Sequence, residues 1–424
     1  MGSMERDSAI SGFYKMGVKE RLEKVGEYAG LDKEDIAKLG KYAALDEATA
    51  DRMIENVIGT TQLPLGVATN FRVNGRDYLI PMALEEPSVV AAASNAAKLA
   101  RPSGGFDCEA TEPVMIGQIQ IVNVKDFAKA KEAIEKGKKE LLDSANSRDS
   151  MLVKFGGGAR DIEIRGLEFE GKRFMVLHLL VDVRDAMGAN AVNTMCEFIS
   201  PKIEELTGGE TRMRIISNLA VHRTVKARAV WKKGLLGGDA VVGKVLEAYA
   251  FAAADIFRAS THNKGIMNGI DAVLLATIND WRAVEAGAHT FAGMDGKYRP
   301  LTRYSKDKEG NLVGELEMPM AVATVGGATR THPIAQVAFK ILGVKNAKEF
   351  AEVLGAVGLA QNFAAMRALA TEGIQKGHMR LHARNIAVIG GAKGKYIDIV
   401  ADKMVKEGNI SAARAKEMLG QDVK

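Results

Sequence analysis

Residues 161–183, with the sequence DIEIRGLEFEGKRFMVLHLLVDV, predict two consecutive β-strands near the middle of the chain. Both halves are rich in the branched and apolar side chains that strands favour. Stretches with helical spacing lie on either side, and each is bounded by a further strand-like stretch. In chain order the elements are Val114–Val124 (strand), Lys125–Asn146 (helix), Asp161–Glu170 and Arg173–Val183 (strands), Met187–Leu206 (helix) and Thr211–Ala220 (strand). The order β-α-β-β-α-β is that of a ferredoxin-like unit.

The segments before and after this unit predict a larger, mostly helical domain that the unit interrupts. Asn74-Gly75, between Val67–Val73 and Arg76–Pro81, predicts a two-residue hairpin turn. The other expected elements are helices at Lys19–Tyr28, Lys33–Lys41, Glu47–Ile58, Ser88–Ala100, Ala240–Arg258, Lys264–Thr277, Asp280–Ala292, Pro333–Leu342, Ala347–Val357, Leu359–Gly373, Tyr396–Glu407 and Ser411–Leu419, and a strand near Leu312–Thr324. The fold class is therefore α+β, with the large domain at 1–110 and 221–376, the small ferredoxin-like domain at 111–220 and a C-terminal helical segment at 377–424.

The composition excludes several classes of protein. Among 424 residues, 58 are Lys or Arg and 53 are Asp or Glu, so the net charge is +5. The chain has no block of basic residues that would suggest nucleic acid or an anionic membrane as a partner. No stretch reaches the roughly 18–20 apolar residues that a membrane helix needs. Two cysteines, Cys108 and Cys196, cannot form a disulfide framework or a four-thiolate metal site. We expect a soluble, cytoplasmic protein.

A turn between a predicted strand and a predicted helix is a candidate for binding phosphate. The chain has neither G-x-G-x-x-G nor G-x-x-x-x-G-K-[ST], which argues against a Rossmann or P-loop site. Asp185-Ala186-Met187-Gly188-Ala189-Asn190 lies where the predicted strand Arg173–Val183 gives way to the predicted helix Met187–Leu206. Its small residues permit close backbone approach to an anion at a helix N-terminus. The alternative is an ordinary tight turn in which Asp185 is the cap.

A polar stripe on one predicted helix is a second candidate. Lys264, Asn268 and Asp271 recur at i, i+4 and i+7 in a segment that is otherwise apolar. Such groups are costly to bury unless they are paired or functional, so the alternatives are a solvated face and a reactive centre.

Two histidines near the C-terminus have a spacing that suits chemistry. His378 and His382 lie one helical turn apart, but the residue after His378 is methionine, so the zinc motif H-E-x-x-H is absent and no metal site is predicted. Solvated surface histidines and acid/base groups both remain open. The serine-hydrolase motif G-x-S-x-G is also absent.

Taken together, these segments resemble the soluble class II reductases of 3-hydroxy-3-methylglutaryl-coenzyme A (HMG-CoA). The matching stretches run in the family's order: Glu55–Gly59, Leu63–Ala68, Glu85–Ser94, Asp185–Asn190, Thr261–Gly265, Asn279–Ala283, Thr324–Gly327 and Leu381–Asn385. The resemblance implies reduction of HMG-CoA to mevalonate and coenzyme A with two NAD(P)H. It also implies that the small domain binds the dinucleotide, that the C-terminal segment is a mobile flap, and that homodimers with interfacial active sites assemble as a trimer of dimers.

The resemblance also assigns roles to residues. The catalytic groups would be Glu86, Lys264, Asp280 and His378; the substrate contacts Ser88, Arg258, Asn268, His382, Asn218 and Gln361; and the cofactor contacts Asp149, Asp185, Met187, Gly188 and Asn190. A lysine ammonium can stabilise the negative charge that hydride attack places on a carbonyl oxygen. His378 would protonate the coenzyme A thiolate, and Arg258 suits the substrate carboxylate because its planar fork matches two oxygens.

The sequence also leads to expectations about the choice between NADH and NADPH and about the direction of the reaction. The resemblance places Asp149 at the adenosine ribose, where a carboxylate favours NADH and repels the 2′-phosphate of NADPH, although Arg148 beside it could bind that phosphate. In the alternative, both residues are solvated in a loop. Oxidation of mevalonate by the same residues, and a coenzyme-A-binding protein that lost catalysis, are the alternatives to a biosynthetic reductase.

Overall fold

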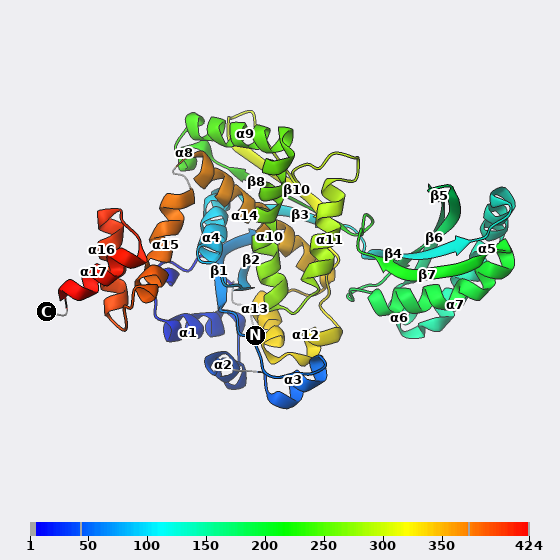
Figure 1. Cartoon of the computed structure of the whole chain (residues 1–424), viewed down its shortest axis with the longest axis horizontal. Coiled ribbons are helices and arrows are strands. Elements are labelled where there is room, and N and C mark those ends of the chain that lie inside the picture. The colour runs from blue at the N-terminus through cyan, green and yellow to red at the C-terminus, as the bar shows by residue number, and fades with distance from the viewer. Residues whose placement is uncertain (1–5, 43–44, 372–373, 423–424) are drawn as a thin grey trace.

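The computed structural model describes residues 6–42, 45–371 and 374–422, with the side chains of 374–381 and 421–422 outside the description. Its elements form a large domain, a small domain at one end of the molecule and a C-terminal helical unit at the other (Figure 1). The α+β class with an inserted small domain is therefore as the sequence predicts.

The large domain is built on a six-stranded sheet in the order β2-β1-β3-β8-β10-β9. Its strands are β1 (Leu65–Val73), β2 (Arg76–Ala83), β3 (Phe106–Ala110), β8 (Thr224–Trp231), β9 (Thr302–Lys306) and β10 (Leu312–Pro319). β1 and β2 form the predicted hairpin, and both turn residues, Asn74 and Gly75, have positive φ. Three of the strands (β3, β8 and β9) are additional to the sequence prediction.

The helices of the large domain pack around this sheet. They are α1 (Val18–Ala29), α2 (Lys33–Gly40), α3 (Glu47–Met53), α4 (Val89–Ala100), α8 (Lys233–Leu236), α9 (Asp239–Ala254), α10 (Ile256–Ala276), α11 (Trp281–Ala292), α12 (Gly327–Thr331), α13 (Pro333–Leu342) and α14 (Ala347–Ala370), with 3₁₀ turns at Phe13–Lys15 and Arg101–Ser103. The predicted helix Glu47–Ile58 is too long, because α3 ends at Met53 and Asn56 has a φ of 56°.

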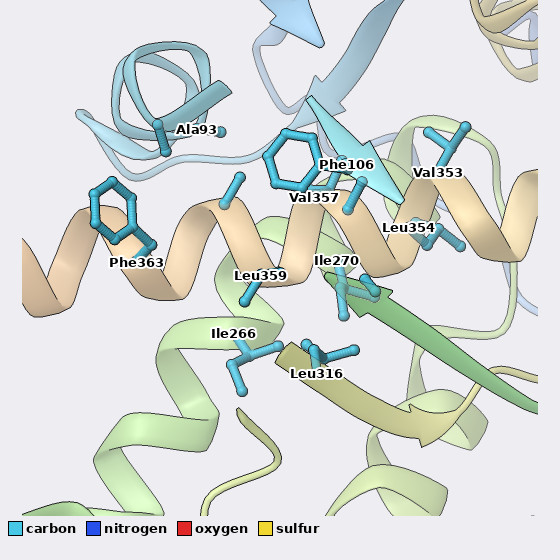
Figure 2. Packing of buried hydrophobic residues seen from close by; sticks show 14 of the residues in the cluster. Ala93, Phe106, Ile266, Ile270, Leu316, Val353, Leu354, Val357, Leu359 and Phe363 are labelled. Carbon is cyan, nitrogen blue, oxygen red and sulfur yellow. The ribbon is translucent and has the colours of Figure 1, made fainter. Parts of the chain in front are cut away.

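α14 is the central core helix of the large domain. The sequence predicts two helices, Ala347–Val357 and Leu359–Gly373, but the structure has one, because Gly358 permits close packing against Ile270 of α10 rather than ending a helix. Figure 2 shows Val357 and Phe363 of α14 among side chains from the sheet and α10. α14 is also long and apolar enough to cross a membrane, but 67% of its most apolar window is buried inside the protein. It is packed as a core helix of the large domain.

α9 and α10 are separated at Asp255, whereas the sequence predicts one helix over Ala240–Arg258. Asp255 has extended backbone angles, and its carboxylate accepts a hydrogen bond from the Arg258 main-chain N–H at 2.7 Å. It is therefore the N-cap of α10. The correction moves Arg258 into the first turn of α10, the helix that also carries Lys264 and Asn268.

The small domain is a four-stranded antiparallel sheet in the order β5-β6-β4-β7. Its elements are β4 (Val114–Val122), α5 (Phe127–Arg148), α6 (Ser150–Lys154), β5 (Gly158–Phe169), β6 (Lys172–Asp182), α7 (Ala189–Thr207) and β7 (Glu210–Ser217). Numbered within the domain, the strand order is 2-3-1-4, which is the ferredoxin-like arrangement. Its apolar cluster is separate from that of the large domain and includes Ile119, Leu177 and Ile199.

The C-terminal unit consists of α15 (Ile374–Ile389), α16 (Tyr396–Glu407) and α17 (Ala412–Asp422). Its buried residues, among them Ala383, Val400 and Met418, form an apolar cluster of their own. Gly391 and Gly394, which lie between α15 and α16, both have positive φ, a conformation that glycine adopts without strain. In Figure 1 this unit lies at the opposite end of the molecule from the small domain.

Candidate active site

Glu86 and Lys264 meet although they are far apart in the sequence. Glu86 follows β2, Lys264 lies in the third turn of α10, and Lys264 Nζ is 3.8 Å from Glu86 Oε2. The side chain of Lys264 is 63% exposed and that of Glu86 is 34% exposed in the single chain. An ammonium beside a carboxylate in an accessible position can meet a carbonyl oxygen that becomes negative, so this pair is the centre of the candidate site.

The segment that carries Glu86 lines a large cavity. The cavity has a volume of about 1740 Å³, and its lining includes Glu85, Glu86 and Ser88, together with residues of α1, α2 and β1. Ser88 has a φ of 84°, an uncommon left-handed conformation for a residue other than glycine. The chain therefore turns sharply between Glu86 and the start of α4, in a space large enough for a coenzyme.

The polar stripe of α10 ends at Asp271, and its neighbour on α11, Glu285, is a residue that the sequence did not assign to the site. Burial is the main cause that raises the pKa of Asp271 to about 8, and the neighbouring carboxyl group of Glu285 on α11 raises it further. The positive charge of Lys264 lowers the pKa of Asp271 in opposition to these effects. One oxygen of Asp271 is buried with no hydrogen-bond partner. The pair therefore holds a proton near neutral pH.

Arg258 is available for an external carboxylate. It lies half-buried in the first turn of α10, and its Nη2 is 3.6 Å from the sulfur of Met366. Burial lowers the pKa of Arg258, and within the described residues its guanidinium forms no ion pair with a carboxylate. A guanidinium without an internal counter-ion suits a ligand carboxylate.

Gln361 presents an unsatisfied acceptor beside α10. Its side chain is 5% exposed, and its Oε1 is buried without a hydrogen-bond partner. A Cβ added at Gly269 would lie 2.9 Å from Gln361 Cβ, so the glycine next to Asn268 is what lets the two helices meet there. A buried amide oxygen without a donor is unfavourable in the free protein and fits a site completed by a ligand.

Two further predicted residues lie around α11. Asp280 is the N-cap of α11 and accepts a hydrogen bond from the Ala283 N–H at 3.1 Å. It does not form an ion pair with Lys264 within 4 Å in the described part of the chain. Ile278, shortly before Asp280, has a φ of 51°, a rare conformation for a β-branched residue and a strained point at the site. Asn218 is exposed, and its carbonyl oxygen packs against Gly287 of α11.

The turn before α7 has the features of an anion-binding turn and is also tied to the large domain. Gly188 has a φ of 101°, and a Cβ there would lie 2.5 Å from Val183 Cγ1, so only glycine fits. Met187 and Asn190 lie on either side of it, at the N-terminus of α7. The carboxylate of Asp185 accepts a hydrogen bond at 2.8 Å from the N–H of Ala347, the first residue of α14.

Asp149 lies between α5 and α6. One of its oxygens accepts a hydrogen bond from the Leu152 N–H at 2.9 Å and caps α6. The guanidinium of Arg148 stacks on the ring of Phe198 at 5.7 Å. The cap uses one carboxylate oxygen of Asp149 and leaves the other for a ligand.

The two predicted histidines lie on α15. The side chain of His378 is outside the described residues, and His382 is half-buried. In the described part of the chain, no group of three or more His, Cys, Asp or Glu residues could hold a metal ion.

Comparisons with known proteins agree with one another. A family model described as hydroxymethylglutaryl-coenzyme A reductase matches residues 17–383. The 3-hydroxy-3-methylglutaryl-coenzyme A reductase of Archaeoglobus fulgidus is 57% identical over 97% of this chain and 94% of its own length. A probable reductase of the same name from Borreliella burgdorferi is 40% identical over 84% of this chain and 82% of its own length.

Solved structures lead to the same family. The reductase of Streptococcus pneumoniae matches with a TM-score of 0.84 and 40% identity, covering 98% of this chain and 99% of that one. A class II structure from the same organism, bound to NADPH in open conformations, matches with a TM-score of 0.83 and 43% identity over 85% of this chain and 99% of that one.

Proposed function

The chain belongs to the hydroxymethylglutaryl-coenzyme A reductase family, and we propose that Lys264 and Glu86 form the centre at which it reduces the thioester of HMG-CoA. The activity is that of an NAD(P)H-dependent oxidoreductase of the mevalonate pathway. The observation that carries the proposal for the residues is the 3.8 Å contact between Lys264 Nζ and Glu86 Oε2 in an accessible position.

Lys264 would act on the carbonyl oxygen of the substrate. A bound nicotinamide cofactor supplies the hydride in each of two reductions. The Lys264 ammonium donates a hydrogen bond to the oxygen on which negative charge develops, and this stabilises the transition state more than the ground state. Glu86 holds the ammonium in place and can return a proton to it after transfer to the oxygen. Asp280 joins them when bound substrate or a second subunit completes the site.

The remaining substrate contacts are assigned by their chemistry. Arg258 binds the free carboxylate of the substrate, since it lacks an internal counter-ion. The unsatisfied amide oxygen of Gln361 accepts a hydrogen bond from a substrate hydroxyl. Ser88, Asn268, His382 and Asn218 complete the contacts. His378, on α15, protonates the departing coenzyme A thiolate when the C-terminal unit closes over the site.

The cofactor site is proposed at one end of the small domain. The N-terminus of α7 faces the pyrophosphate, with Asp185, Met187, Gly188 and Asn190 around it. Gly188 supports this placement because a side chain there would collide with Val183. Asp149 accepts hydrogen bonds from the adenosine ribose, which favours NADH over NADPH. No metal takes part in the proposed reaction.

A homodimer with interfacial active sites is the proposed assembly, and a trimer of dimers the proposed higher state. The chain exposes Phe251, Ile256 and Phe257 at the junction of α9 and α10, and Phe257 is 83% exposed. Large apolar side chains gathered beside Arg258 favour a covered surface at the substrate site. We also propose a cytoplasmic location. The proposed domain limits are 1–110 and 221–376 for the large domain, 111–220 for the small domain and 377–424 for the C-terminal unit.

The test is a spectrophotometric assay of nicotinamide oxidation with HMG-CoA, run with NADH and with NADPH. We expect consumption of two reduced cofactors for each HMG-CoA and release of coenzyme A. A folded protein that binds coenzyme A but oxidises neither cofactor would overturn the catalytic proposal in favour of a binding protein. Growth on mevalonate as carbon source, dependent on this gene, would favour the oxidative direction.

A further inference from the structure

Arg223 is a buried arginine at the junction of the two domains. It follows β7 of the small domain and directly precedes β8 of the large domain. Its side chain is 4% exposed. A buried guanidinium is costly unless all its donors are satisfied, so its partners decide what it does.

All the side-chain hydrogen bonds of Arg223 go to main-chain carbonyl groups of two separate segments. Nη1 donates to the carbonyl of Ala186 at 3.0 Å and to that of Met187 at 3.4 Å, and Nη2 donates to the carbonyl of Val322. The first two carbonyls belong to the turn before α7, and the third belongs to the segment that follows β10. One rigid fork therefore joins two loops that come from different domains.

The charge of Arg223 is not neutralised by a direct ion pair within the described residues. Burial lowers the pKa of Arg223 to about 10. The negative charges of Asp185 and Asp182, which act through space, raise this pKa in opposition to burial. The group is still fully protonated at neutral pH. A positive charge thus lies beneath the turn that leads into the N-terminus of α7, where an anion is stabilised by unpaired N–H groups.

A second tie joins the same two segments. The Thr324 N–H donates to the carbonyl of Asp185 at 3.0 Å, and the Arg223 carbonyl accepts a hydrogen bond from the Met320 N–H at 2.8 Å. Arg223 is thus the side-chain element of a main-chain junction that runs from Asp185 to Thr324.

We propose that Arg223 is a positioning residue for the dinucleotide: its buried guanidinium fixes the Ala186–Met187 turn against the Val322 segment and so pre-forms the pyrophosphate-binding end of α7. The inference rests on the proposed cofactor site. Preorganisation lowers the conformational entropy that binding must otherwise remove. The interactions of Arg223 are with the protein backbone, so its effect on the reaction is exerted through those loops.

The test compares Arg223→Lys and Arg223→Gln with a control, Arg228→Gln. Arg228 lies in β8, five residues after Arg223, but it is exposed and its nearest partner, Glu315, is 3.9 Å away. Binding of NADH, ADP-ribose and HMG-CoA is measured by calorimetry on the full-length protein. We expect Arg223→Lys to weaken NADH and ADP-ribose by about tenfold, equivalent to about 1.4 kcal/mol, because lysine keeps the charge but cannot hold both loops. HMG-CoA affinity should be unchanged, and Arg223→Gln should weaken the dinucleotide further.

The outcomes separate this inference from the proposed function. Wild-type protein that binds neither NADH nor NADPH would overturn the proposed cofactor site itself. If the wild type binds NADH but Arg223→Lys binds it equally well, or if NADH and HMG-CoA affinities fall together, Arg223 is not a positioning residue for the dinucleotide.

A second measurement does not depend on the glutamine variant folding. Hydrogen–deuterium exchange of the Thr324 amide should become faster in Arg223→Lys, while exchange in the hairpin of β1 and β2 stays unchanged. In steady-state kinetics the same variant should raise the KM for NADH with a smaller change in kcat. Unchanged exchange at Thr324 would contradict the proposal.

Discussion

The proposed substrate side and the proposed cofactor side of this protein are built in different ways. In the large domain, Glu86 and Lys264 come from distant parts of the sequence and meet only through the packing of α10 against β2 and α4. In the small domain, Asp185, Met187, Gly188 and Asn190 lie within six consecutive residues and are shaped by one local turn. The first site depends on the tertiary fold, whereas the second depends on a turn and on the contacts that hold it.

The two sides also differ in how their polar groups are satisfied. On the substrate side, Gln361 and Asp271 each keep a buried oxygen without a partner, and Arg258 lacks a counter-ion. On the cofactor side, the carboxylates of Asp149 and Asp185 already accept main-chain hydrogen bonds. Substitutions on the substrate side should therefore act mainly on chemistry and ligand binding. On the cofactor side they should act on loop geometry and on the choice of ligand.

The largest expected effect is that of Lys264→Ala. Removal of one group that stabilises developing charge lowers kcat by about 10²–10³. The matched control is Lys226→Ala, since Lys226 is 64% exposed and 3.6 Å from Glu317, close to the 63% and 3.8 Å of Lys264 with Glu86. The kcat of both variants is measured with HMG-CoA and NADH. Near-normal turnover by a folded Lys264→Ala protein would show that Lys264 is not a catalytic residue. The substrate side would then not differ from the cofactor side in its response to substitution.

Truncation after Gly391 should have the next largest effect. It removes α16 and α17, which cover Ala383 and Ala387 of α15 in the apolar cluster of the C-terminal unit. Without them α15 is no longer held for closure, and misplacement of a reacting group by about 1 Å can lower the rate by about 10²-fold. Affinities for HMG-CoA and NADH should change little. Arg414→Gln, which breaks exposed ion pairs with Glu407 and Glu417, is the control; full activity of the truncated protein would refute the role of the unit.

The sequence predicted the small domain well because its signals are local. Alternating strands, two periodic helices and a turn before α7 are all contained in short windows, and the observed strand order agrees with the prediction. β3 and β9 were missed because they have only five residues each. β8 was missed although its charged residues, Lys226 and Arg228, alternate with buried apolar residues in the pattern of a half-buried strand.

The substrate side was less accessible to prediction from patterns. Spacing identified the stripe of Lys264, Asn268 and Asp271, but Glu86 could be paired with Lys264 only through the family resemblance. The partner of Asp271, Glu285, lies on another helix and left no signal in the sequence near Asp271. The role of Arg223 could not be predicted from the sequence either, because this side chain binds main-chain carbonyl groups, which every residue has. Contacts that use the backbone or distant helices become visible only in the folded chain.

A smaller effect is expected from Asp149→Ser, which tests ligand choice on the cofactor side. Serine can still cap α6, but it removes the negative charge that disfavours a 2′-phosphate. We expect the ratio of kcat/KM for NADH to that for NADPH to fall by about tenfold, as loss of one charge-assisted hydrogen bond predicts. Asp126→Ser, at the opposite end of α5, is the control because Asp126 is also an N-cap. A wild type that prefers NADPH, or an unchanged ratio in the variant, would show that Asp149 is not the selector.

The smallest expected effect concerns the stability of the substrate side as pH changes. The pKa of Asp271 is raised from 3.8 to about 8, chiefly by burial, so the folded protein keeps a proton that the unfolded chain releases. Between pH 3.8 and about 8 the unfolded state therefore binds fewer protons than the folded state, and stability falls as pH rises through this window. Asp271→Asn keeps the neutral shape and removes this titration.

The melting temperature of the variant should consequently fall less between pH 5.5 and pH 8 than that of the wild type. The difference should be about 1–3 °C, because a chain of this length has a large unfolding entropy. Asp143→Asn, an exposed position in α5, is the control and should follow the wild-type curve. The cofactor side has no buried proton of this kind in its described residues, so ligand-free protein isolates the effect of the substrate side. Parallel curves for wild type and Asp271→Asn would mean that Asp271 is ionised in the folded protein and that its unpartnered oxygen carries charge.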